Sequence, residues 1–172
     1  MKLNIKETAV FALLGALMYA TKIIMEILPN VHLLGVFIVA ITAVYRKKAL
    51  YPIYIYVFIN GLFSGFAMWW IPYLYIWTVL WGAVMLLPKN IPERARPIVY
   101  MTVCALHGFL FGTLYAPAQA LLFGLDFKGM IAWIAAGLPW DFVHGVSNFI
   151  CGTLICPVIA VLKHSEKYMT RN

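Results

Sequence analysis

Long apolar runs, separated by short clusters of charged residues, constrain the fold of this chain more than any other feature. Hydrophobic residues make up 64% of the sequence and charged residues 11%, and the mean hydropathy is +0.89. Soluble domains carry about 25% charged residues over a smaller apolar share. A water-soluble surface cannot be built from this composition, so the sequence predicts an integral membrane protein.

The apolar runs predict helices, because they show no sustained alternation with the period of two that a β-barrel needs. A spanning helix takes about 20 apolar residues, so 172 residues allow about six crossings and leave little for loops. We therefore expect a single all-α domain over residues 1–172, a bundle of six transmembrane helices. Between the last two helices, residues 126–137 predict a loop with a short interfacial helix. The helices, as Pro, Gly and charge bound them, are expected at 8–28, 31–45, 49–66, 71–87, 98–123 and 139–162.

The distribution of Lys and Arg predicts the orientation. Eleven of the thirteen basic residues fall at the two ends of the chain or in the connections after the second and fourth helices, and only Lys22 and Lys128 fall on the other side. Cytoplasmic loops carry the excess of basic residues, so both termini are expected in the cytoplasm. The net charge of +7 therefore reflects topology, and no nucleic-acid partner is expected.

Several kinds of chemistry have no support in the sequence. Cys104, Cys151 and Cys156 lie in apolar segments without C-x-x-C spacing, which predicts packing residues and neither disulfides nor a zinc site. The chain contains no H-E-x-x-H, no G-x-S-x-G and no phosphate-binding loop of the G-x-x-x-x-G-K-[ST] type. We expect no enzyme activity, no cofactor and no metal, and any ATP hydrolysis must come from a partner.

The first helix carries a face of small side chains. Ala12, Ala16 and Ala20 are spaced by four residues and therefore stack on one side of the helix. Such faces allow a second helix to approach closely in lipid, either within the bundle or from another subunit. At the end of the same helix, Lys22 and Glu26 predict an i, i+4 ion pair in preference to substrate ligands.

The last helix carries a polar stripe. Asp141, His144 and Asn148 share one face, which is expensive against lipid and indicates a ligand site, a proton route or an internal hydrogen-bond network. In the structural alternative, Pro139 occupies the first turn, Asp141 caps the helix, and His144 and Asn148 tie helices together.

Two further stripes complete a candidate pocket. The fourth helix carries rings at Trp70, Tyr73, Trp77 and Trp81, whose alternatives are core packing and an interfacial belt. The fifth helix carries His107, Tyr115 and Gln119 on one face. Rings from one helix and polar groups from two others predict a pocket open to the outside.

With these features the chain resembles the substrate-binding S component of energy-coupling factor (ECF) transporters, the micronutrient importers of prokaryotes. The resemblance rests on size, on six expected spans with both ends inside, on Ala12-Ala16-Ala20, on the outer Trp69-Trp70 region and on the run 139–144 with Asn148. It implies a multi-pass subunit of the cell membrane, surrounded by lipid, that captures a vitamin or related compound from outside. It also implies that the alanine face docks onto a T component driven by two ATPases.

By position, the resemblance and the stripes assign the substrate to Trp70, Tyr73, Trp77, Tyr115, Gln119, Asp141, His144 and Asn148. The ligand set of no individual vitamin binder can be matched residue by residue, and the aromatic supply favours a ring-containing compound. The alternative is a solitary secondary transporter that couples uptake to protons through Asp141, His144 or His107. Against it, the chain is small and lacks the internal repeat of many carriers.

Overall fold

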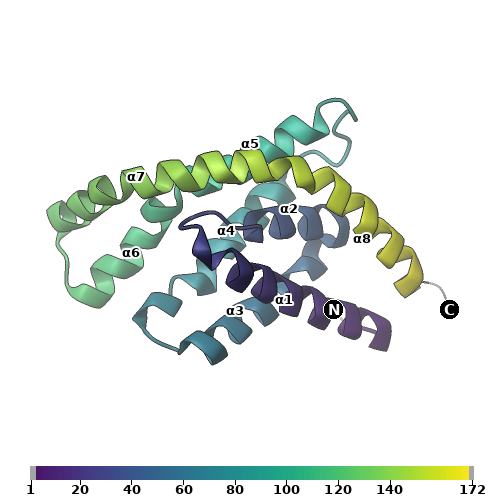
Figure 1. The fold of residues 1–172 in the computed structure, drawn as a ribbon, viewed down its shortest axis with the longest axis horizontal. Coiled ribbons are helices and arrows are strands. Elements are labelled where there is room, and N and C mark those ends of the chain that lie inside the picture. Colours follow the sequence, from purple (N-terminus) through teal and green to yellow (C-terminus); the bar gives the residue numbers. More distant parts are fainter. Residues whose placement is uncertain (1–2, 171–172) are drawn as a thin grey trace.

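Helices account for the fold in the computed structural model, which describes residues 3–170 (Figure 1). No strand occurs in this range, which confirms the all-α prediction. The α-helices are α1 (Ile5–Ile24), α2 (Leu34–Tyr45), α3 (Leu50–Ser64), α4 (Tyr73–Leu86), α5 (Arg96–Phe109), α6 (Phe111–Phe123), α7 (Phe127–Cys151) and α8 (Ile155–Thr170). Short 3-10 turns join several of them, at Met25–Ile27, Arg46–Ala49, Met68–Trp70 and Gly152–Leu154.

Four helical stretches within residues 3–170 are long and apolar enough to cross a membrane. They are Ile5–Ile27, Met68–Leu86, Arg96–Phe123 and Phe127–Met169. The count of six spans is not supported, because α2 has 12 residues and α3 has 15. At 1.5 Å per residue these helices reach about 18 and 22 Å, short of the roughly 30 Å of a hydrocarbon core.

The predicted boundaries fail at two places in the second half. The expected fifth helix is interrupted at Leu110, which separates α5 from α6. The expected loop at 126–137 is wrong, because α7 begins at Phe127 with Asp126 as its N-cap, whose Oδ1 accepts from the Gly129 N–H at 2.7 Å. Pro139 therefore lies inside α7 and not in the first turn of a helix.

Helix α2 lies at the centre of the bundle. Ten of its twelve residues are buried, which fits a helix that is hydrophobic on all sides. It packs mainly against α4 and α8, while α1 packs on α3 and α5 on α7. The core around it includes Ile38, Ile41, Ile53, Ile76 and Leu80.

Glycines set the close approach of α5 and α7. A Cβ placed on Gly108 would lie 2.9 Å from the Cα of Gly145, and one on Gly145 would overlap the Phe109 ring at 2.4 Å. Small residues at a helix crossing let two backbones approach closely in this way. The two helices can therefore place His107 and His144 at neighbouring positions in the interior.

The beginning of α1 and the end of α8 lie at the same end of the molecule, and α6 meets the first half of α7 at the other (Figure 1). Asn4 Nδ2 donates to the Met169 carbonyl at 3.4 Å, and Lys48 forms an ion pair with Glu7. The fold thus gathers basic residues that are far apart in the sequence. At the far end of α1, the predicted ion pair of Lys22 with Glu26 is confirmed at 3.1 Å.

Candidate functional site

Trp77 of α4 is the centre of a buried group of rings in the interior of the bundle. Its ring centroid lies 5.7 Å from that of His107 on α5, 5.7 Å from that of Phe111 on α6 and 6.4 Å from that of His32, which precedes α2. The Trp77 side chain is 2% exposed. Rings from two other helices and one connection thus converge on a single indole.

His144 of α7 closes this group on the other side. Its ring centroid lies 4.8 Å from that of His32 and 5.0 Å from that of Phe111, and the residue is buried. We refer to His32, Trp77, His107, Phe111 and His144 as the Trp77 cluster. Aromatic walls with a few convergent polar groups are typical of small-molecule sites.

The polar atoms of the Trp77 cluster are largely without partners. Nδ1 of His32 and of His107, Nε2 of His144 and Nε1 of Trp77 are buried and make no hydrogen bond within the described part of the chain. A buried polar atom left unpaired costs about 1 to 3 kcal/mol, so native proteins usually satisfy such atoms. Four of them in one cluster can be satisfied together by a polar ligand that enters it.

The hydrogen bond of His107 fixes which of its two ring nitrogens carries the proton. Its Nε2 lies 3.1 Å from the Ile76 carbonyl oxygen, which can only accept, so Nε2 carries the proton. The unpartnered Nδ1 of His107 is then an acceptor, whereas the Trp77 Nε1–H is a donor. The cluster offers a ligand both kinds of hydrogen-bonding group.

Asn60 of α3 is a further buried polar group without a partner. Its Nδ2 and Oδ1 are both buried without a partner among residues 3–170, and the residue has no exposed surface. It lies one helical turn from Tyr56, whose ring centroid is 6.3 Å from that of Trp77. The amide therefore stands on the side of α3 that faces Trp77.

His32 lies in the connection between α1 and α2, outside the four candidate spans. Burial of its ring, reinforced by the charge of Lys22, lowers the pKa of His32 to about 4. The imidazole is therefore neutral at pH 7, and it can act as donor and acceptor without a charge.

The structure brings together part of the residue set that the sequence singled out. Trp77 and His144 belong to the cluster, and Tyr73 contacts Trp77 with ring centroids 5.4 Å apart. Trp70 does not reach the cluster by any described contact. Its Nε1 donates to the Val57 carbonyl at 2.8 Å, a bond that ties the connection before α4 to α3.

Tyr115 and Gln119 lie further along α6. The Tyr115 hydroxyl donates to the Trp69 carbonyl at 3.0 Å, and its ring stacks on Trp133 with centroids 5.7 Å apart. Tyr115 also contacts Phe111 at 6.2 Å, so it lies next to the cluster without being part of it. Gln119 is half-buried one turn beyond and makes no hydrogen bond within residues 3–170.

Asp141 and Asn148 hold helices together. The Asp141 carboxylate accepts from the Gly112 backbone N–H, so it caps α6. The structural alternative, in which Asp141 caps its own helix, is therefore wrong. The reason is that α7 starts fourteen residues earlier, at Phe127. Asn148 Nδ2 donates to the Cys104 carbonyl at 3.3 Å, while its Oδ1 is buried and unpaired.

Sequence reasoning missed His32 and Asn60. His32 has no polar neighbour at helical spacing, and Asn60 has only Ser64, four residues on, so neither belongs to a polar stripe. The available signal for Asn60 was a single amide within the apolar run 49–66, and His32 followed the break at Pro29. No group of three His, Cys, Asp or Glu side chains in the described range is arranged to hold a metal ion.

Comparison of the chain with protein-family models, curated proteins and solved structures gives no match.

Proposed function

We propose that this chain is the membrane-embedded substrate-capture subunit of an ECF-type importer. It binds a small, vitamin-like compound from the outside and delivers it through a T component and two ATPases. The subunit performs no chemistry on its substrate. It binds the substrate and then docks onto the T component.

The observation that carries the proposal is the Trp77 cluster with its four unpartnered polar atoms. A ring-containing substrate would stack among Trp77, Phe111 and Tyr73, while His32, His107 and His144 supply its hydrogen bonds. Among the residues that the sequence singled out, this argument gives the central roles to Trp77 and His144. Asp141 and Asn148 then position the helices that carry the ligands.

The exposure pattern of α1 supports the docking step. Ala12, Ala16 and Ala20 are exposed, whereas Phe11 and Met18 on the other side of the helix are buried in the core. The alanine face is therefore not used for packing within the bundle. A T-component helix could approach this face closely because its three side chains are small.

The orientation is proposed from the basic residues. The contacts Asn4–Met169 and Lys48–Glu7 gather both ends of the described chain and the 46–48 turn at one end of the bundle. With this end in the cytoplasm, α2 runs toward the basic side of the bundle and α3 runs back from it, so that the two form a short pair. Tyr73 is at the outer end of α4, so Trp77 lies one turn inward from the outside.

A solitary proton-coupled transporter is the second candidate, and the buried imidazoles of His107 and His144 favour it. Ionisable groups inside a membrane bundle are typical of proton relays. The two candidates differ in their energy source. The first needs ATP and partner subunits, whereas the second needs only a proton gradient.

The test is identification of the bound compound, followed by uptake. Protein purified in mild detergent would be analysed by mass spectrometry for co-purifying small molecules, and the compound found would be titrated back onto emptied protein. Uptake of that compound into liposomes is then compared with and without a T component and ATPases. Uptake that requires ATP supports the importer, and uptake by the chain alone under a proton gradient supports the carrier.

A further inference from the structure

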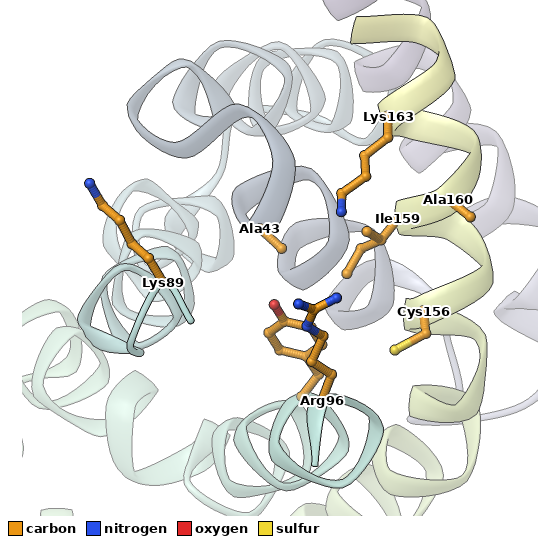
Figure 2. A pocket seen from close by; sticks show the side chains of 8 residues that line it. Ala43, Lys89, Arg96, Cys156, Ile159, Ala160 and Lys163 are labelled. Carbon is orange, nitrogen blue, oxygen red and sulfur yellow. The ribbon is translucent and has the colours of Figure 1, made fainter. Parts of the chain in front are cut away.

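A cavity lined by basic residues, and by none of the Trp77 cluster, lies between helices that carry basic side chains (Figure 2). It has a volume of about 310 Å³ and opens between α2, α5 and α8. Ala43 and Ile159 give it an apolar wall, and Arg96, Tyr100, Lys163 and Lys89 give it a polar one. Neither the capture site nor the alanine face uses any of these residues.

The cations of this cavity lack strong acidic partners. Arg96 Nε donates to the Ile91 carbonyl at 2.9 Å, which holds the side chain in place, and its Nη1 is 3.7 Å from a carboxylate oxygen of Glu93. The Glu93 side chain is 89% exposed, so water screens this ion pair. Lys163 forms no ion pair within residues 3–170, and no Asp or Glu lines the cavity.

The two principal cations converge from different helices. Arg96 on α5 and Lys163 on α8 both extend toward the space between these helices, and Ala43 of α2 lies beside it (Figure 2). Lys89 stands apart at the rim, with its amine directed away. The Tyr100 hydroxyl, one turn from Arg96 on α5, makes no hydrogen bond within the described chain and adds a neutral donor.

We propose that this cavity binds a phosphate group, with Arg96 and Lys163 as its charged ligands and Tyr100 as a third donor. A guanidinium presents paired N–H groups to phosphate oxygens, and an ammonium adds a point charge. Basic pockets between transmembrane helices on the cytoplasmic side are typical sites for anionic lipid headgroups. The phosphate belongs either to such a headgroup, with acyl chains along Ile159, or to a soluble phosphate compound.

The test measures thermal stabilisation of the full chain in neutral detergent. Four additives are compared: phosphatidylglycerol, phosphatidylcholine, diacylglycerol and inorganic phosphate. The variant Arg96→Gln/Lys163→Gln is set against Lys47→Gln/Arg94→Gln, which removes the same charge from exposed residues outside the cavity at the same end. Lys163→Gln alone is included because Lys163 is exposed, so its loss leaves the fold intact.

We expect phosphatidylglycerol to raise the melting temperature of the parent and of the Lys47→Gln/Arg94→Gln control. For Arg96→Gln/Lys163→Gln, the lipid concentration needed for half of this rise should increase about tenfold or more, and Lys163→Gln should be intermediate. Stabilisation by inorganic phosphate with the same dependence on the variants also supports the site and assigns it to a soluble ligand. Stabilisation by phosphatidylcholine with the same dependence on the variants also supports the phosphate site. Equal stabilisation by diacylglycerol, which has no phosphate, or equal loss in both double variants, would overturn the proposal.

Discussion

The carboxylate of Asp141 on α7 accepts hydrogen bonds from the backbone N–H of Gly112 in the first turn of α6, at 3.0 Å to Oδ1 and 3.1 Å to Oδ2. The first N–H groups of a helix have no partner within it. Gly112 and Asp141 are both buried, so water is not at hand to serve as the acceptor of this N–H. Asp141 supplies one, and its position near the positive end of the α6 dipole favours an acid.

Asp141→Ala should therefore destabilise the protein by about 1 to 2 kcal/mol, the usual effect of losing a helix cap. Asp141→Asn keeps an acceptor and should lose less. Thermal unfolding in detergent measures both. Glu26→Gln is the control, because it breaks only the exposed ion pair with Lys22 and should change stability by under about 0.5 kcal/mol. An Asp141→Ala variant that melts with the parent would show that the cap is not needed.

Asp141 also illustrates how far the sequence could predict the fold. The structural alternative made Asp141 the cap of its own helix, but Asp141 caps α6 through Gly112, 29 residues earlier in the chain. The spacing of residues shows only which side chains share a face of the same helix, so it cannot identify a partner on another helix. The same limit applies to residues 126–137, where the mixture of polar and apolar residues suggested a loop with a short interfacial helix. The cap at Asp126 and packing against α6 make this stretch part of α7.

The candidate site was predictable where polar or aromatic residues repeat at helical spacing. Trp77 and His144 belong to such stripes, and the fold places both in one cluster. His32 and Asn60 belong to no polar stripe, and only packing brings His32 to Trp77 and sets Asn60 one turn from Tyr56, whose ring contacts Trp77. Spacing also could not separate ligands from structural residues, because Asp141 and His144 look alike on a helical face.

Two tryptophans of α4 allow binding to be separated from stability. Trp77 Nε1 has no hydrogen-bond partner in the described chain, whereas Trp81 Nε1 donates to the Arg46 carbonyl at 3.0 Å. Trp77→Phe should weaken binding of the co-purifying compound about tenfold and lower the melting temperature only as far as the volume lost from the core requires. Trp81→Phe should lower the melting temperature and leave affinity unchanged.

Titration of each purified tryptophan variant, together with a thermal scan, gives both values. His144→Ala should follow Trp77→Phe, with binding weakened about tenfold or more and the bundle still folded. Unchanged affinity in both Trp77→Phe and His144→Ala, with early melting, would mean that the cluster is a structural core and that the substrate binds elsewhere.

The lowered pKa of His32 predicts how stability depends on pH. The pKa is about 4 in the folded chain and near 6.5 when unfolded, so between these values only the unfolded chain takes up a proton at this site. The contribution of neutral His32 is complete above pH 6.5 and is lost as the pH falls toward 4. His32→Asn lacks this term, so its melting temperature should fall less steeply than that of the parent over the same range. Parallel pH profiles would contradict the prediction.

The gathering of basic residues at one end predicts the topology. Reporter tags fused to either terminus should report from the cytoplasm, because eleven of the thirteen Lys and Arg residues belong to that side. A tag inserted after Gly124, in the connection between α6 and α7, should report from outside. External signals from both termini would reverse the orientation and place the Trp77 cluster on the inner side, and an external signal from one terminus alone would mean an odd number of spans.

The exposed alanine face of α1 gives the sharpest test of the importer itself. Ala16→Trp places a large ring where the face is now nearly smooth, and the residue is exposed, so the bundle can accept the change without repacking. Substrate binding should match the parent, while ATP-dependent uptake by the assembled transporter should fall at least about tenfold, because the T-component helix can no longer approach closely. Leu121→Trp on α6 is the matched control, an equally bulky change at a site that is 86% exposed but far from the alanine face along the chain. Both variants would be assayed for titrated binding in detergent and for uptake into liposomes. Normal uptake by Ala16→Trp, or an equal loss in Leu121→Trp, would show that this face does not dock a partner.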